Sequence, residues 1–226
     1  MVTRDTVTPH LTIAIDGPVA SGKSTVGRIV AQELGCRVLD TGWMYRAIAY
    51  AGLNAQLDLN DQDEMTRLAE RLTIKLVESK RGERLLVNGN DVTDQLHDSR
   101  VEQGVVPVAA IRGVRRLLVH QQRSIATDGP IVMVGRDIGT MVIPDATIKF
   151  YLIASPETRA KRRYEERKNT PDSPSYDDVL ERLVHRDKID SQRAESHPAD
   201  DAVIIDSDSL DASETARRII DLIEDA

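Results

Sequence analysis

The sequence predicts an α/β protein with a parallel β-sheet and helices on both of its faces. Two observations support this fold class. Short apolar segments that suit buried strands alternate with longer segments of helical character, which is typical of parallel sheets covered on both sides. Hydrophobic residues make up 40% of the 226 residues and aromatic residues only 3%, so aliphatic side chains must fill a sizeable core.

The first elements follow this alternation in order. Residues 11–16 (LTIAID) predict a buried strand, followed by a glycine-containing turn and a helix that ends near Gly35. Residues 37–40 (RVLD) predict a second strand and residues 41–53 a second helix. Strand, helix, strand and helix in succession are what a parallel sheet requires.

The middle of the chain breaks the pattern. Residues 73–79 and 83–89 are strand-like and flank a Lys-Arg-Gly turn, which is a hairpin signal. Turn-forming residues follow in NGNDVTDQL. We expect a small antiparallel insertion over residues 72–100 between two parts of the core, 11–71 and 101–226.

The alternation then resumes. We expect strands over 131–134, 148–154 and 202–206, and helices over 114–126, 156–168, 176–194 and 214–223. The polar stretch 169–175 carries two prolines between two of these helices and predicts a loop.

Composition excludes several classes of protein. The net charge of −7 argues against a general nucleic-acid binder, and the single cysteine, Cys36, excludes an intramolecular disulfide framework. No apolar run reaches the roughly 18 residues of a membrane helix, and the N-terminal residues have no apolar core of a signal peptide. We expect a cytoplasmic protein.

A glycine-rich loop joins the first strand to the first helix. GPVASGKST has the pattern Gly-x4-Gly-Lys-Ser, with a strand before it and a helix after it. Its backbone N–H groups and the helix N-terminus can surround an anion. Lys23 would bind the β- and γ-phosphates of a nucleoside triphosphate, most simply ATP, and Ser24 would bind Mg²⁺. The predicted nucleotide-binding residues are Gly17, Pro18, Val19, Ala20, Ser21, Gly22, Lys23, Ser24 and Thr25.

This motif leaves the class of ATP-binding protein open. We find no Asn-Lys-x-Asp base reader of GTP switches, and residues 131–134 end without the carboxylate of motor ATPases. A small kinase is the alternative, and it needs a second substrate opposite the loop.

Charged residues gather where that second substrate would bind. Thr41 opens a helix and Arg46 follows one turn later, while Arg136 and Asp137 follow the strand 131–134, at the sheet edge where α/β proteins bind ligands. A surface helix arginine and a structural salt bridge are the alternative interpretations. Arg115 alone suggests only a solvated face.

Two further helices carry arginines at helical spacing. Arg159, Arg162, Arg163 and Arg167 form one stripe beside the proline-containing loop, which suggests an arginine-rich lid over about 156–175 or a solvated face. Arg182, Arg186, Asp190 and Arg193 form another, which suggests either internal ion pairs or a clamp on phosphate and ribose.

The whole pattern resembles the bacterial cytidylate (CMP) kinases of the nucleoside monophosphate kinase group. The resemblance covers roughly residues 11–224 and includes IDGPVASGKST, LDTGWMYRA, LVNGNDVT, VRRLLVHQQR, GRDIGT, IPDATIKFYLIAS, RAKRR and HRDKIDSQRA in family order. It implies a P-loop kinase fold with a five-stranded parallel core, a monophosphate-binding insertion and a helical lid. It also implies transfer of a phosphoryl group from ATP, with Mg²⁺, to CMP or dCMP by a monomer.

The resemblance also implies roles for single residues. The acceptor phosphate would be bound by Thr41, Arg46, Arg136 and Arg193, cytosine by Arg115 and Asp137, and ribose by Arg186 and Asp190. Arg162 and Arg163 fall in the lid, toward ATP. Two positions depart from the family, Val134 in place of an acidic residue and Val106 in place of serine, and we expect both to remove polar groups near the acceptor base.

We expect direct in-line transfer, with Lys23, Arg136 and Arg163 neutralising charge and no residue acting as a nucleophile. The alternatives are a kinase for another acceptor, such as UMP or shikimate, and an ATP-binding module without turnover. Shikimate is disfavoured because the insertion and the paired arginine clusters suit a phosphorylated acceptor.

Overall fold

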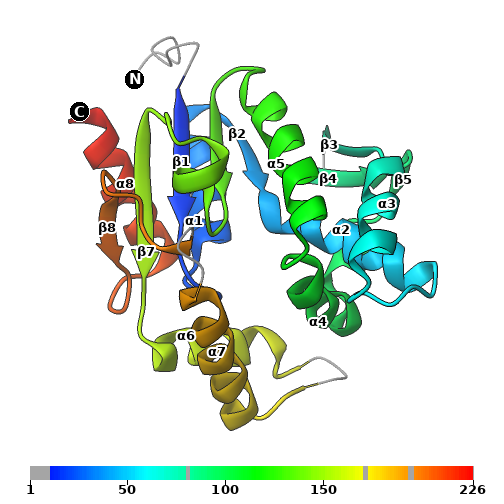
Figure 1. The fold of residues 1–226 in the computed structure, drawn as a ribbon. Coiled ribbons are helices and arrows are strands. Elements are labelled where there is room, and N and C mark those ends of the chain that lie inside the picture. The colour runs from blue at the N-terminus through cyan, green and yellow to red at the C-terminus, as the bar shows by residue number, and fades with distance from the viewer. Residues whose placement is uncertain (1–10, 80–81, 170–172, 193–195, 226) are drawn as a thin grey trace. The chain divides into compact units, whose positions relative to one another are not determined.

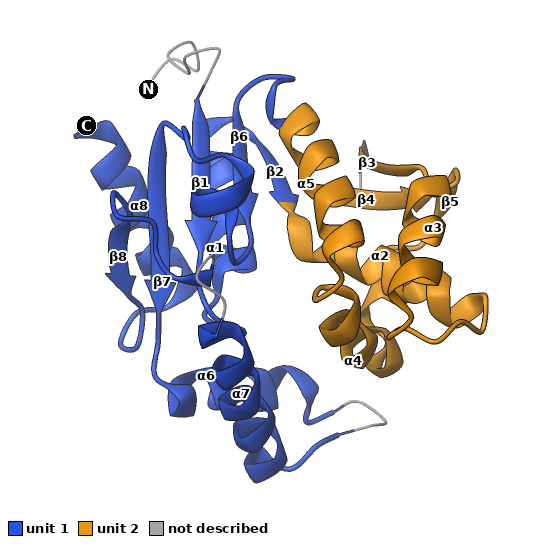
Figure 2. Cartoon of the chain, in the orientation of Figure 1, with its two compact units in different colours: residues 1–39, 126–226 blue, residues 40–125 orange. Residues whose placement is uncertain are grey.

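The computed structural model describes residues 11–79, 82–169, 173–192 and 196–225. The chain forms two compact units (Figure 2). One unit consists of residues 1–39 and 126–226, and the other of residues 40–125. The predicted insertion at 72–100 lies within the second unit.

The first unit is built on a five-stranded parallel sheet of order β2-β6-β1-β7-β8 (Figure 1). Its strands are β1 (Thr12–Asp16), β2 (Arg37–Asp40), β6 (Ile131–Val134), β7 (Ile148–Ile153) and β8 (Val203–Asp206). The central strand β1 pairs with β6 on one side and β7 on the other. The predicted α/β class and five-stranded parallel sheet are confirmed.

Two helices of this unit pack against its sheet. α1 (Lys23–Leu34) and α8 (Ala212–Glu224) bury their apolar faces in one core cluster with the inner strands. At Gly27 the backbone of α1 comes so close to β6 that an added Cβ would lie 2.5 Å from Val134 Cγ2. Val134 is fully buried in this cluster, so its side chain belongs to the core between β6 and α1.

Two more helices, α6 (Pro156–Arg167) and α7 (Tyr176–Ser191), pack on each other through a separate small cluster. Each begins with a serine cap. Ser155 accepts from the Thr158 N–H, and Ser175 forms a capping box with Asp178. These caps fix the points at which the chain enters the two helices.

The second unit combines helices with a small antiparallel sheet of order β3-β4-β5. Its elements are α2 (Thr41–Asn54), α3 (Gln62–Arg71), β3 (Ile74–Ser79), β4 (Gly82–Val87), β5 (Asn90–Asp91), the 3-10 turn η1 (Asp94–His97), α4 (Ser99–Val108) and α5 (Arg112–Ala126). The expected hairpin is β3–β4. Asn88 and Gly89 join β4 to β5 with φ angles of 50° and 84°, as a two-residue hairpin turn requires.

Helices α3 and α4 were not predicted, nor were the short elements β5, η1 and η2. The other strands and helices match the predicted ones within a few residues. Among the described residues, no helix is both long and apolar enough to cross a membrane.

Candidate active site

The phosphate-binding loop (residues 17–25) has the backbone of an anion site. Gly17, Ala20 and Gly22 have φ angles of 151°, 59° and 92°. A Cβ at Gly17 would collide with the carbonyl oxygen of Leu152, so only glycine fits there. Gly22 caps α1 without a side-chain hydrogen bond, so the N–H groups of the first turn of the helix are directed at the loop's interior.

Two side chains of the loop support the same interpretation. Lys23 folds back over the loop, and its Nζ donates to the Pro18 carbonyl at 2.7 Å. The Ser21 hydroxyl oxygen is buried and has no hydrogen-bond partner among the described residues. A buried hydroxyl of this kind, beside the N-terminus of a helix, suits a bound phosphate group.

Asp16 connects the start of this loop to the GRDIGT segment. Its carboxylate accepts from the backbone N–H of Ile138 at 2.9 Å and of Gly139 at 2.8 Å. Burial raises the pKa of Asp16 to about 6, against the lowering effect of these two hydrogen bonds. After β6 the GRDIGT segment (residues 135–140) runs into a short π-helical turn, η2 (Ile138–Val142). Such turns are found frequently at functional sites.

Three predicted substrate residues meet at Asp190 of α7. Its carboxylate pairs with Arg136 and with the Nε of Arg186, the latter at 3.2 Å. Burial, followed by repulsion from Arg186, lowers the pKa of Arg136 to about 10, so Arg136 is still charged at neutral pH. The predicted internal ion pair between Arg186 and Asp190 is present. Arg193 lies outside the described residues.

The arginines of α6 do not form one exposed stripe. Arg159 is only 3% exposed, donates from Nε to the Ala154 carbonyl, and pairs through both terminal nitrogens with Asp187 of α7. It also donates to the Val19 carbonyl of the phosphate-binding loop. Arg159 is therefore on neither a solvated face nor an open lid.

Arg162 is engaged in a similar way. It donates to the Ser21 carbonyl of the phosphate-binding loop and to the carbonyls of Ser207 and Leu210 beyond β8. Arg163 is turned differently and pairs with Glu166 at 3.0 Å on the helix surface. Arg159 and Arg162 therefore contact the phosphate-binding loop, whereas Arg163 pairs with Glu166 on the helix surface.

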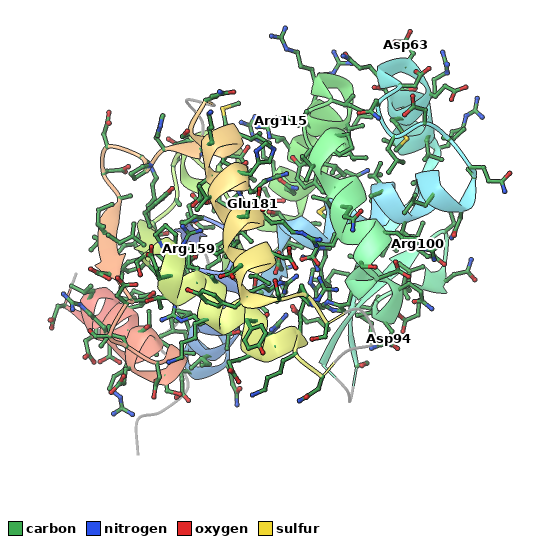
Figure 3. The ribbon with its side chains drawn as sticks, turned by 90° about the horizontal axis from the view of Figure 1, so that it is seen from below. Asp63, Asp94, Arg100, Arg115, Arg159 and Glu181 are labelled. Atoms are coloured by element: carbon green, nitrogen blue, oxygen red, sulfur yellow. The ribbon has the colours of Figure 1, made fainter. Side chains whose placement is uncertain are left out.

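Asp137, a predicted substrate residue of the first unit, is buried just before η2. The other predicted substrate residues, Thr41, Arg46 and Arg115, belong to the second unit. Asp40 caps α2 through the Gly42 N–H, and Thr41 is buried at the start of that helix. Arg46 lies one turn further on, donates to the Leu96 carbonyl at 3.5 Å and faces Glu102 at 3.9 Å. Arg115 lies in the first turns of α5 (Figure 3).

Sequence reasoning missed Asp16 and Asp187. Asp16 immediately precedes Gly17 and ends a strand, which was a usable signal. Asp187 carried none. The side chain of Val134 packs in the core against Gly27, and its effect on the surroundings of the acceptor base stays a prediction.

Comparison with known proteins shows the family to which the chain is similar. A family model described as cytidylate kinase matches residues 13–225. The cytidylate kinase of Bacillus velezensis is 45% identical over 216 residues, covering 95% of this chain and 96% of that protein. Those of Bacillus subtilis (44%; 95% and 96% covered) and Carboxydothermus hydrogenoformans (39%; 93% and 96% covered) are similar.

Solved structures agree at the level of the fold. A shikimate kinase from Bacteroides thetaiotaomicron aligns with a TM-score of 0.52 at 13% identity, over 95% of this chain and 98% of that one. A shikimate kinase from Acinetobacter baumannii in complex with shikimate aligns with a TM-score of 0.50 at 19% identity, over 97% and 94%. At these identities the likeness concerns the fold alone.

Proposed function

Because the chain belongs to the cytidylate kinase family, we propose that it transfers the γ-phosphoryl group of ATP to CMP or dCMP. One observation within the first unit carries the proposal. Strands β1 and β6 are neighbours, and at their carboxyl ends lie the phosphate-binding loop and the Arg136–Asp190–Arg186 cluster. A site for a triphosphate and a cationic cluster for a second anion thus start from adjacent strands.

ATP would be held mainly by the phosphate-binding loop. The N–H groups at its centre, the start of α1 and the Lys23 ammonium would bind the β- and γ-phosphates. Among the described residues there is no group of three or more His, Cys, Asp or Glu side chains that could hold a metal. From the loop's sequence pattern, the Ser24 hydroxyl and the phosphate oxygens would hold Mg²⁺, which when bound supplies positive charge for the phosphates.

The predicted contacts of the acceptor phosphate are Thr41, Arg46, Arg136 and Arg193. The predicted contacts of cytosine are Arg115 and Asp137, and those of ribose are Arg186 and Asp190. Binding would replace part of the Arg136–Asp190 pair with an arginine–phosphate pair, which guanidinium geometry favours.

Transfer would proceed in one in-line step. A bond forms between an oxygen of the acceptor phosphate and the γ-phosphorus, and the bond to the bridging oxygen of the leaving ADP breaks. The attacking oxygen is already ionised, so no protein base is needed. Lys23, Arg136 and Arg163 would offset the charge that develops.

We also propose that the protein is a monomer, that it is located in the cytoplasm, and that its substrates are free nucleotides rather than nucleic acid.

The test is a coupled assay of ADP release with CMP, dCMP, UMP and AMP, each with the wild type and Lys23→Ala. We expect turnover with CMP and dCMP, reduced at least about 10²-fold by Lys23→Ala. A preference for UMP would instead establish a different pyrimidine kinase. No turnover with any acceptor, together with measurable ATP binding, would leave an ATP-binding module.

A further inference from the structure

We propose that Arg159 and Arg162 are positioning residues that hold the phosphate-binding loop in its anion-binding form, and that Asp187 orients Arg159 for this role. The inference rests on the proposed function, in which that loop binds ATP. It gives Arg162 a role in shaping the loop in place of direct contact with ATP.

The first argument is the direction of two peptide groups. Arg159 Nη1 donates to the Val19 carbonyl at 3.1 Å, and Arg162 Nη1 donates to the Ser21 carbonyl at 3.3 Å. In a trans peptide the carbonyl and the following N–H point in opposite directions. With these carbonyls turned toward α6, the N–H groups of Ala20 and Gly22 point away from it, into the loop.

The second argument is the strain that this arrangement maintains. Ala20 lies between the two held peptides and has a φ of 59°, in the left-handed region that alanine avoids. The loop's other positive φ angles belong to glycines. A non-glycine residue persists in such a conformation only where its surroundings determine it. The two guanidiniums, one on each side of Ala20, supply that determination.

The third argument is that burial and hydrogen bonds to the protein hold the Arg159 guanidinium in one orientation. It is 3% exposed, and its Nε is taken by the Ala154 carbonyl at 2.9 Å. Both terminal nitrogens face the Asp187 carboxylate, at 3.1 and 2.5 Å. A buried guanidinium needs such a partner, and the bidentate pair fixes its plane. Asp187 therefore orients the guanidinium so that Arg159 Nη1 can also donate to the Val19 carbonyl.

Apolar packing brings the same elements together. The side chains of Val19 and Ala20 pack against a cluster of Ala160 from α6 and Val179 and Leu183 from α7. α6 and α7 thus form a platform under the loop, with an apolar part and two arginines. A change in this platform is expected to alter ATP binding without contact between the arginines and ATP.

The experiment compares Arg159→Met, Arg159→Lys, Asp187→Asn and the control Lys161→Met, an exposed position on the same helix. Dissociation constants for ATP and for CMP are measured separately by calorimetry. Hydrogen exchange of the amides of residues 19–24 and the melting temperature are measured on the same samples. Neither binding nor exchange requires turnover, so the result stands apart from the test of phosphoryl transfer.

For Arg159→Met we expect a Kd for ATP raised about tenfold, equivalent to roughly 1.4 kcal/mol, with faster exchange in the loop and a Kd for CMP within about twofold of wild type. Arg159→Lys keeps the charge and loses the bidentate geometry, so it should be intermediate. Asp187→Asn should act in the same direction as Arg159→Met. Lys161→Met should match the wild type in every measurement.

Unchanged affinity for ATP and unchanged loop exchange in Arg159→Met would overturn the proposal. An equal loss of affinity for ATP and CMP with a lowered melting temperature would also overturn it, because it would indicate a merely structural role. Should Arg159→Met fail to fold, Arg159→Lys and Asp187→Asn decide by the same comparison. Absence of CMP phosphorylation in the wild type would refute the proposed function and leave this ATP-binding comparison valid.

Discussion

Asp16 offers the sharpest test of the electrostatics of the first unit. Its side chain is 6% exposed at the end of β1, and each carboxylate oxygen accepts one N–H of the η2 turn. Burial raises its pKa from 3.8 to about 6. The ionised form that makes both hydrogen bonds is therefore held in an unfavourable environment.

The perturbation is Asp16→Asn, which keeps the shape and removes the charge. The amide oxygen accepts one N–H, and the other buried N–H loses its acceptor at a cost of about 1–3 kcal/mol. Against this, a change of about 2 in pKa means that the charge itself costs about 3 kcal/mol near pH 7. The two effects nearly cancel in stability at pH 7. The effect on activity is not cancelled. We expect kcat to fall about tenfold, because Asp137 precedes the two N–H groups that Asp16 holds and would be less well positioned.

The pH dependence separates the two effects. An aspartate whose pKa is raised on folding contributes stability that is complete below the unfolded value, 3.8, and is lost as the pH rises through about 6. Between pH 7 and pH 5 the wild type should therefore gain about 1 kcal/mol of unfolding free energy relative to Asp16→Asn. Urea unfolding at pH 5, 6, 7 and 8 measures this gap, with the exposed Asp145→Asn as a control. A gap that is constant from pH 5 to 8, or that has the opposite sign, would refute the reasoning.

Three shorter predictions concern the same unit. Gly27→Ala should lower the unfolding free energy by about 1–3 kcal/mol in urea titrations, because its Cβ would lie 2.5 Å from Val134 Cγ2. Arg136→Lys should reduce kcat/KM for CMP about 10²-fold in the coupled assay, with the melting temperature nearly unchanged, because lysine cannot bind a phosphate bidentately. Asp137→Asn should reduce the preference for CMP over UMP, measured as the ratio of their kcat/KM values, at least about fivefold if Asp137 accepts from the cytosine amino group.

The strands of the first unit were predictable because parallel strands are buried on both faces and read as apolar runs. All four residues of Ile131–Val134 are buried, for example. α3 escaped detection because only Met65 and Ala69 of its residues are buried, so its apolar signal is weak. α4 contains Pro107 near its end, a residue that argues against a helix when read without the tertiary structure.

The motif residues of the site were predictable, but their partners were not. Periodicity placed Arg159 and Arg162 on one face of a helix and could not say whether solvent or the phosphate-binding loop lies against that face. The same limit applies to Arg136 and Asp190, which are far apart in sequence and meet only through the packing of α7. Such contacts depend on tertiary structure, which local sequence patterns do not encode.

The position of Val134 changes how selection of the acceptor base should be understood. The Gly135 N–H still bonds to the Ile15 carbonyl, so the β6–β1 ladder continues through Gly135 and Arg136 is the next residue along. Val134 itself is fully buried in the core cluster with α1, so its side chain contributes to helix–sheet packing. On the proposed function, the predicted contacts for selecting cytosine are still Asp137 and Arg115. In this chain the valine that departs from the family pattern packs against the helix backbone at Gly27.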